Sequence, residues 1–164
     1  MRLRREDFAW YQGVKISLFD VSSVENPSEI SKYVIGDRGT DSPILRDHKA
    51  FLFNEERNIL VIPILLAEID EDKYYGRVPL NAYGDYVWQG IYVFTVNETG
   101  IFLRGRIAHI KDPEVFAKSG FYFYSKYAIK RALYIGDFLY SISDGMIKVN
   151  VLRDLREVAE VNLP

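Results

Sequence analysis

WQGIYVFTVN, at residues 88–97, has a counterpart in WYQGVKISLFDVS, at residues 10–22, and this pair decides the fold. Both stretches read Trp, then Gln-Gly, then alternating β-branched and aromatic residues, with Tyr11 as one extra residue in the earlier copy. A third copy, GMIKVNVL from Gly145, keeps the glycine and the alternation but lacks the Trp-Gln pair. Such alternation is typical of half-buried β-strands, and its recurrence along the chain predicts a repeat protein.

Each copy is followed by a turn and a second strand-like segment. These segments lie at residues 30–35, 101–110 and 157–163. The last one also fits a helix, because Leu155, Val158 and Ala159 have helical spacing. The repeat pattern favours a strand there as well.

Two of the copies are also preceded by matching hairpins, at residues 48–64 and 129–143. In the second hairpin, Gly136-Asp137 supplies a tight two-residue turn. In the first hairpin, the innermost strand is expected to open at His48. The two hairpins together complete two units of four strands each.

Two local features refine this pattern. The apolar run from Ile59 to Leu66 fits a strand that is buried on both faces. Pro63 within it predicts a bulge or the end of hydrogen bonding, because proline has no amide proton to donate. Asp112-Pro113 is a good helix start and predicts one short helix near residues 113–119.

The predicted fold is therefore all-β, with about two and a half four-stranded antiparallel blades of the β-propeller type. One blade covers residues 47–110, another covers 128–164, and residues 8–36 form half a blade. Together they make a single propeller-like domain, or a partial propeller, over residues 1–164. One blade cannot bury both of its faces alone, so blades stack face to face around an axis.

Composition narrows the function classes. A formal charge of −2 and a pI near 5.7 argue against a dedicated nucleic-acid binder, which would show a basic face. The chain has no cysteine, which excludes disulfides and thiolate metal sites, and no apolar run approaches the length of a membrane span. The start of the chain does not read as a signal peptide, which predicts a cytoplasmic protein. Scarce glutamine and plentiful charge are compatible with a thermophilic source.

The loop from Gly36 to Ser42 is the best candidate for a ligand-binding loop, because it joins the outer strand of one blade to the inner strand of the next. The candidate ligand-binding residues are Asp37, Arg38, Thr40, Asp47 and His48. Arg38 could clamp a carboxylate or phosphate with two hydrogen bonds. Alternatively, Asp37 and Arg38 pair with each other and brace the crossover between blades.

The two histidines and two tryptophans each leave alternatives open. His48 and His109 could form a metal or acid–base site with a nearby carboxylate, but hydrogen bonding at the rim of the blades is favoured. Trp10 and Trp88 occupy matching positions in the repeat. They could form an aromatic ligand platform, although repeated core packing is favoured.

Several motifs, in order along the chain, carry a resemblance to a known family. These are Leu18-Phe19-Asp20-Val21-Ser22 with Asn26-Pro27, Ile35-Gly36-Asp37-Arg38-Gly39-Thr40, Asp47-His48-Lys49-Ala50-Phe51, and Leu103-Arg104-Gly105-Arg106-Ile107 with His109. The chain resembles the archaeal and bacterial β-propeller-domain proteins that are distantly related to WD repeats. The resemblance covers nearly the whole chain and corresponds to the C-terminal part of the family. It implies a propeller fold, and it is compatible with an exported or surface-attached protein.

No catalytic motif stands out, so the leading hypothesis is a non-catalytic propeller segment that acts as a binding and assembly module without a cofactor. We expect self-association through exposed blade edges, or a protein partner that supplies missing blades. We expect no nucleic-acid partner and no membrane span. The alternative is a hydrolase or metal-dependent enzyme with a rim site around Asp37, Arg38, Asp47 and His48.

Overall fold

The computed structural model describes residues 10–75, 77–120 and 122–164, which form three antiparallel β-sheets. The first sheet pairs β1 (Val14–Asp20) with β2 (Ser28–Ile35). The central sheet holds β3 (Leu52–Asn54), β4 (Ile59–Glu68), β5 (Asp85–Asn97) and β6 (Gly100–Ile107) in that order. The third sheet holds β7 (Arg131–Ile135), β8 (Phe138–Ile142), β9 (Met146–Val151) and β10 (Glu157–Asn162), also in sequence order. The predicted all-β class with four-stranded antiparallel units is confirmed.

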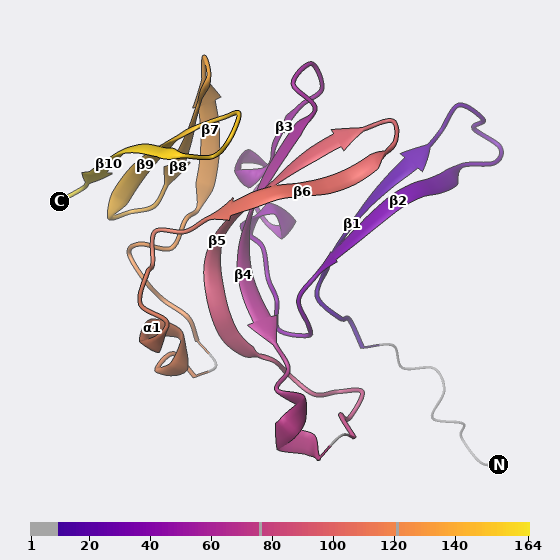
Figure 1. The fold of residues 1–164 in the computed structure, drawn as a ribbon. Coiled ribbons are helices and arrows are strands. Elements are labelled where there is room, and N and C mark those ends of the chain that lie inside the picture. Colours follow the sequence, from indigo (N-terminus) through magenta and orange to yellow (C-terminus); the bar gives the residue numbers. More distant parts are fainter. Residues whose placement is uncertain (1–9, 76, 121) are drawn as a thin grey trace, which may run out of the picture.

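The central sheet lies between the other two, with the first sheet on one side and the third on the other (Figure 1). Each of the two seams holds a hydrophobic core. The first core lies between the first and central sheets and includes Leu60, Ile62 and Phe94. The second core lies between the central and third sheets and includes Val61 and Leu139.

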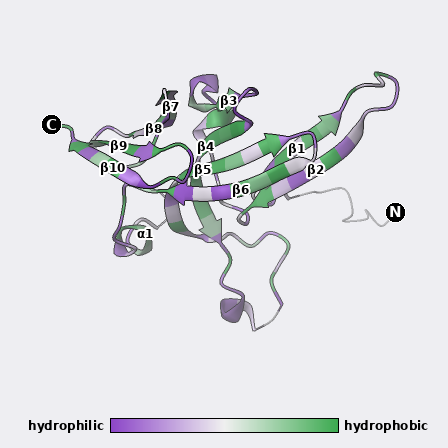
Figure 2. Ribbon diagram, turned by 45° about the horizontal axis from the view of Figure 1, so that its top comes forward, coloured by the Kyte–Doolittle hydropathy of each residue, from purple (hydrophilic) through white to green (hydrophobic). Residues whose placement is uncertain are grey.

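Strand β4 contributes to both cores because its side chains alternate between the two faces of the sheet. Even-numbered residues from Leu60 to Leu66 enter the first core, and the odd-numbered Ile59 and Val61 enter the second. Figure 2 shows the long hydrophobic stretches in the central sheet. Full burial of an aliphatic side chain stabilises the fold by roughly 1.5–3 kcal/mol, so β4 is a major source of stability. The prediction of a strand buried on both faces is confirmed.

Pro63 does not interrupt β4. It pairs with Ile91 of β5 in regular register, and the register shift lies further along, between Leu66 and Ala67. The ladder with β3 ends before Pro63, at the pair Leu52–Val61, and the hydroxyl of Ser42 donates to the Pro63 carbonyl over 2.6 Å. The prediction of a bulge is therefore wrong. The ladder with β3 ends before Pro63, but hydrogen bonding on that edge resumes at Leu65, whose amide and carbonyl bond to the Asp41 carbonyl and amide over 2.8 and 2.9 Å.

The innermost strand of the central sheet begins later than expected. The Asp47 side chain accepts a hydrogen bond from the Lys49 amide over 2.9 Å and caps a short 3-10 turn, η2 (His48–Ala50). A second 3-10 turn, η1 (Pro43–Leu45), precedes it. The prediction that His48 opens the strand is wrong, because local capping by Asp47 favours a helical turn over an extended chain.

The repeated glycine has a steric reason. A Cβ atom on Gly13 would lie 2.2 Å from the Gly36 carbonyl oxygen, and one on Gly90 would lie 2.2 Å from the Ile107 carbonyl oxygen. In both sheets the glycine lies one residue before the first pair with the outermost strand, Val14–Ile35 or Ile91–Ile107, and the end of that strand comes close to it. Any side chain at either position would force the two backbones apart.

The remaining local predictions hold. The segment that also fitted a helix forms strand β10, and the short helix is α1 (Glu114–Ala117), with the Asp112 side chain accepting from the Glu114 amide over 2.9 Å. Gly136 turns the β7–β8 hairpin at a φ of 57°, which glycine tolerates without strain. A third 3-10 turn, η3 (Glu71–Tyr74), lies in the connection between β4 and β5.

Candidate functional site

The crossover loop between the first and central sheets is tied to the end of β4. The Asp37 carboxylate accepts from the Ile69 amide over 2.7 Å, and the Asp37 amide donates to the Ala67 carbonyl over 2.9 Å. The Thr40 hydroxyl lies 3.0 Å from both the carbonyl and the amide of Ala67 and forms a hydrogen bond with each. Asp37 and Thr40 therefore satisfy backbone groups where the regular pairing of β4 ends.

Arg38 lies in an aromatic cage. Its guanidinium carbon is 4.1 Å from the Trp10 ring centroid and 4.3 Å from that of Tyr83, and its Nη1 donates to the Asn81 carbonyl over 2.7 Å. Only 9% of the residue is exposed. Each cation–π contact contributes about 0.5–2 kcal/mol, and these contacts take up the faces of the guanidinium. Arg38 therefore holds the β4–β5 connection, through its hydrogen bond to Asn81 and its contacts with Trp10 and Tyr83.

Two more contacts cross the same boundary. The Tyr11 and Tyr83 hydroxyls lie 2.8 Å apart, and the Gln12 amide donates to the Leu80 carbonyl over 3.2 Å. The hydrogen bond to Tyr83 is the main reason that the pKa of Tyr11 is raised.

Asp37 and Arg38 do not pair with each other. Each braces the crossover through the β4–β5 connection instead, which differs from the pairing considered from the sequence.

A cleft of about 540 Å³ adjoins this brace and is lined by Tyr11, Thr40 and Tyr83 among others. The charged groups on its wall are paired: Lys15 lies 2.6 Å from Glu29, and Arg46 lies 2.5 Å from Asp41. The cleft therefore offers phenol groups and neutralised ion pairs rather than an unpaired charge.

Asp47 and His48 lie apart from this group. Asp47 caps η2 and lies 3.8 Å from Arg131 at the start of β7, and His48 is exposed to solvent. The structure thus brings Asp37, Arg38 and Thr40 together against the end of β4 and the connection that follows it, but it gives Asp47 and His48 other surroundings.

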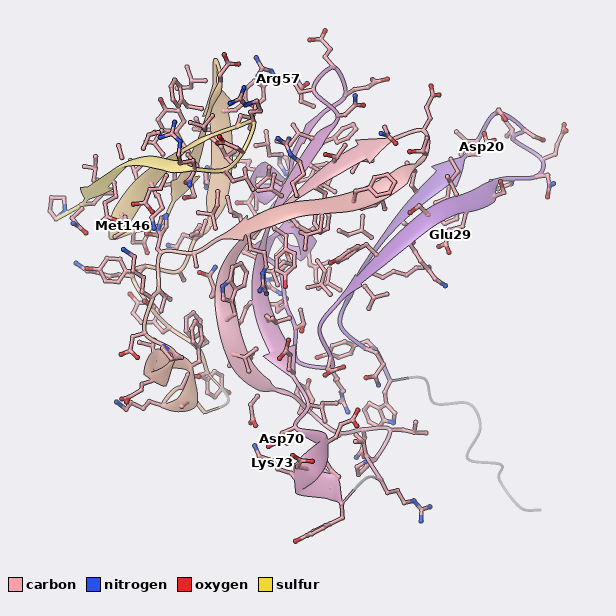
Figure 3. All side chains as sticks on the ribbon, viewed as in Figure 1. Asp20, Glu29, Arg57, Asp70, Lys73 and Met146 are labelled. Atoms are coloured by element: carbon pink, nitrogen blue, oxygen red, sulfur yellow. The ribbon has the colours of Figure 1, made fainter. Side chains whose placement is uncertain are left out.

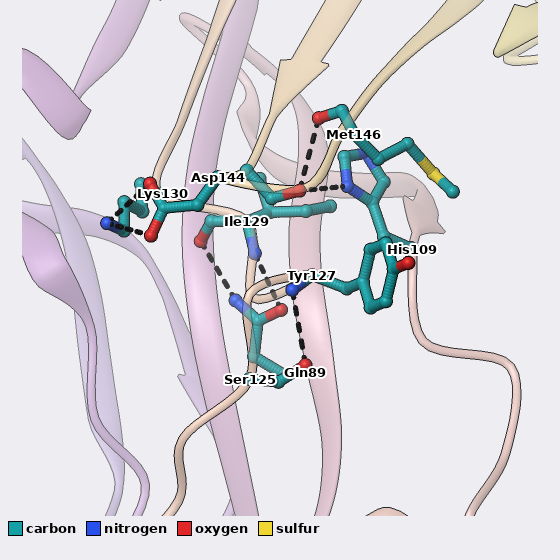
Figure 4. Close-up of polar contacts among 9 residues, drawn as sticks. Gln89, His109, Ser125, Tyr127, Ile129, Lys130, Asp144 and Met146 are labelled. Carbon is teal, nitrogen blue, oxygen red and sulfur yellow. Dashed lines mark hydrogen bonds and ion pairs between the residues drawn. The ribbon is translucent and has the colours of Figure 1, made fainter. Parts of the chain in front are cut away.

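His109 lies in the seam between the central and third sheets and not at a rim beside His48. Its Nδ1 is 3.0 Å from the Ser143 hydroxyl and its Nε2 is 2.8 Å from the Ser141 hydroxyl (Figure 4 shows the first contact). It is 5% exposed. Burial, and then the positive charge of Lys148, lower the pKa of His109 to about 4, so the imidazole is neutral near pH 7.

Gln89 and Lys148 extend this polar seam. The Gln89 side chain accepts from the Ile129 amide over 2.8 Å and donates to the Ile129 carbonyl over 2.9 Å (Figure 4). The buried Lys148 donates to the Ala108 carbonyl over 3.1 Å and lies 3.0 Å from Glu157. These groups join the two sheets by directional bonds.

Sequence reasoning did not identify Gln89 as a residue that joins blades, although a signal was present. Gln12 and Gln89 occupy matching positions in the repeat, and both bond to backbone groups in the following unit, at Leu80 and Ile129. A repeated polar residue beside a repeated glycine marked the contact between units.

The two tryptophans have different roles. Trp88 is half-buried, packs on the first core and meets the Tyr92 ring edge-on at 5.3 Å, as core packing predicts. Trp10 is 39% exposed and covers Arg38, so the core prediction is wrong for this residue. The Trp88 ring centroid also lies 5.2 Å from the Arg106 guanidinium carbon, so each of the two tryptophans contacts an arginine.

Among the described residues, no three His, Asp or Glu side chains lie close enough together to bind one metal ion. Within the same part of the chain, no helix has both the length and the apolar character needed to span a bilayer. Asp70, in the acidic stretch after β4, caps η3, and Lys73 lies on the same turn (Figure 3). Lys73 pairs with Asp85 at the start of β5.

The third sheet has one unusually apolar open face, which we call the distal face because it points away from the central sheet. Its side chains all belong to the register that alternates with the packed residues Ala132 and Leu139. The distal face consists of Leu133, Ile135, Phe138, Tyr140, Ile142, Ile147, Val149, Val151, Ala159 and Val161, with Arg131 in the same register at the start of the edge strand β7. A contiguous apolar surface of this kind is a candidate interaction site.

Two of the comparisons with known proteins found a match. A family model described as a β-propeller domain matches residues 2–155. The chain is similar to the uncharacterized protein MJ1554 of Methanocaldococcus jannaschii, with 28% identity over 130 residues, which cover 79% of this chain and 14% of that protein. The chain thus spans a small part of this relative's length. No solved structure matches the chain.

Proposed function

The chain belongs to the β-propeller domain family, and from this premise we propose that it is a non-catalytic binding and assembly module. Its main contact surface is the distal face of the third sheet. In this proposal the face is buried against a β-sheet of a second copy of the chain. The predicted resemblance to archaeal and bacterial propeller-domain proteins is confirmed by the family match and by the archaeal relative.

The observation that carries the proposal is the contrast between the two faces of the third sheet. The face packed on the central sheet includes the polar residues Ser141, Lys148 and Asn150, all of them buried. On the open face, the two central strands β8 and β9 carry only apolar and aromatic side chains. Ile135 and Phe138, beside the β7–β8 turn, are 63% and 41% exposed. Burial of such side chains favours association, because apolar surface leaves water.

The central sheet supplies an internal precedent for the occupant. It is the sheet of this chain with large apolar residues on both faces of one strand, and it is covered by a β-sheet on each side. The apolar face of a twisted β-sheet commonly packs against the face of another β-sheet. We therefore assign a second copy's sheet to the distal face.

Non-catalytic action is supported by the surroundings of the residues that an enzyme of the alternative kind would use. Asp37 is engaged by backbone groups, Arg38 is enclosed by aromatic rings, and Asp47 and His48 lie elsewhere. A rim-site hydrolase would need these groups converging on one substrate atom.

Sedimentation velocity over a range of protein concentrations tests the proposal. The chain is expected to form dimers or larger species that dissociate on dilution, and Ile135→Lys is expected to shift the equilibrium to the monomer. Val34→Lys is the matched control, because Val34 is a strand valine with 54% exposure outside the distal face. A chain that stays monomeric at every concentration, or equal dissociation by both variants, overturns the proposal.

A further inference from the structure

A second surface lies at the other end of the molecule from α1, where three turns meet. The turns between β1 and β2, between β3 and β4, and between β5 and β6 lie at the same end of the fold (Figure 1). These three turns line a groove of about 1010 Å³ that is open to solvent. This groove shares no residue with the distal face, so what binds it is independent of the assembly proposed above.

The floor of the groove is apolar. Leu18 and Val96 line it where they also pack on the first core, and Phe19, Ile30 and Phe53 line it with large exposed areas. Aromatic and aliphatic side chains that converge on one hollow gain more from an apolar occupant than from water.

The walls of the groove are acidic. Asp20, Glu55 and Glu98 line it, one from each of the three turns, and no lysine or arginine lines it. Within the described part of the chain, none of these three carboxylates forms an ion pair. A hydrogen bond from the Ser22 amide also lowers the pKa of Asp20, which keeps that carboxyl charged. The charge of the groove therefore selects a cationic occupant.

One wall of the groove is also a strand edge. Within the described residues β1 pairs with β2 on one side only, and its last residues, Leu18 to Asp20, line the groove. The backbone groups on an open edge can pair with an added extended chain, which is how many domains bind peptides.

From these three features we propose that the groove docks an extended segment of a partner protein, with apolar residues on one side and lysine or arginine on the other. The segment adds to the open edge of β1 and places its apolar side chains on the floor around Phe53. Its long basic side chains reach the three carboxylates on the walls. Burial of the apolar side chains supplies most of the binding, and the charges set the choice of partner and the rate of encounter.

Fluorescence anisotropy with labelled synthetic peptides tests this proposal on the whole chain. The probe is a peptide of alternating valine and lysine, compared with a peptide of alternating valine and glutamate and with one of alternating glycine and lysine. The valine–lysine peptide is expected to bind at least about tenfold more tightly than either of the others, and more weakly as salt is raised. Equal affinity for all three peptides overturns the proposal.

Two sets of variants locate the binding. The triple variant Asp20→Asn, Glu55→Gln, Glu98→Gln removes the carboxylates of the groove. The triple variant Glu25→Gln, Glu56→Gln, Glu71→Gln makes the same change of charge at exposed positions that do not line it. Only the first is expected to weaken binding of the valine–lysine peptide, by about tenfold or more. Equal loss in both, or no loss in either, overturns the assignment.

Phe53→Ser tests the floor separately. Phe53 is exposed in the free chain, so this change leaves the cores intact, and it is expected to weaken peptide binding severalfold. Unchanged affinity in this variant contradicts the docking mode. Ile135→Lys, which tests assembly, is expected to leave peptide binding unchanged, so a failure of one proposal can be told from a failure of the other.

Discussion

The two seams on either side of the central sheet differ in chemistry. The first seam is built mainly from aliphatic and aromatic side chains, with Tyr33 meeting Phe94 edge-on at 5.0 Å between ring centroids, and the Ile101 amide donates across it to the Ser31 hydroxyl over 3.2 Å. The second seam combines an aliphatic core with the buried polar groups of Gln89, His109 and Lys148. Apolar packing is strong but tolerates sliding, whereas hydrogen bonds fix a direction and a distance. The second seam therefore defines how the two complete sheets sit on one another.

Phe94→Ala is expected to have the largest effect, because it empties the centre of the first seam. Phe94 is fully buried, and truncation of such a side chain costs about 3–5 kcal/mol of the free energy of unfolding. Urea denaturation followed by fluorescence measures this loss. Phe102→Ala, at a half-exposed position on β6, is the control and should cost much less. Similar losses in the two variants would mean that the first seam is not a packed core.

Acidification is expected to weaken the second seam selectively. The pKa of His109 is lowered to about 4 in the fold, against about 6.5 in the unfolded chain. Between pH 6.5 and pH 4 the unfolded state therefore binds more protons than the folded state. The contribution of neutral His109 to the free energy of unfolding is thus fully present above pH 6.5 and is lost as pH falls towards 4. The loss is on the order of 3 kcal/mol.

Denaturation at a series of pH values, with His109→Gln and His48→Gln, checks this expectation. His109→Gln should remove the decline in that window, because glutamine does not titrate. His48→Gln should retain it, since His48 is exposed on η2. The charged groups facing His109 are Lys148 and Glu157, and a decline that persists without His109 would assign the effect to them.

Gln89→Leu sharpens the comparison within the second seam. It keeps the side-chain bulk but removes both partners of Ile129, whose buried amide and carbonyl are left unsatisfied. The expected cost is about 2–3 kcal/mol of unfolding free energy. Amide hydrogen exchange at Ile129 should also accelerate more than exchange in β4. A protected Ile129 amide in this variant would show that the bond is dispensable.

Arg38→Ala has the smallest expected effect, because it acts beside the first seam and not in either core. Loss of the stacking with Trp10 and Tyr83 should cost about 1–2 kcal/mol. It should also release the β4–β5 connection, which limited proteolysis can detect as faster cleavage there. Arg46→Ala removes an exposed ion pair with Asp41 and is the control. Equal cleavage rates in the two variants would contradict a bracing role for Arg38.

Much of the architecture was predictable because it depends on sequence patterns that repeat within a single strand. Alternation revealed the strands, and the unbroken apolar run from Ile59 to Leu66 revealed a strand covered on both faces. The repeated glycine marked a close approach of backbones. These features are local consequences of side-chain size and of the two-residue period of a strand.

The candidate site was less predictable, because its contacts join residues far apart in the chain. The aromatic cage around Arg38 includes Tyr83, which lies in the β4–β5 connection. His109 bonds to Ser141 in β8 and to Ser143 just after it. No short-range pattern encodes such pairs. Asp37 and Arg38 are adjacent in sequence, yet their side chains find separate partners.

By itself, the sequence determined the strands, the three units and the glycines that let them pack, since each follows from local periodicity and sterics. Only the tertiary structure decided which faces are covered. It buried the polar side of the third sheet and left the apolar side open, and it gathered three carboxylates from three turns around one apolar groove. The physical reason is that burial and charge complementarity depend on stacking between sheets, and the alternation along a strand does not say which of its two faces meets a neighbour.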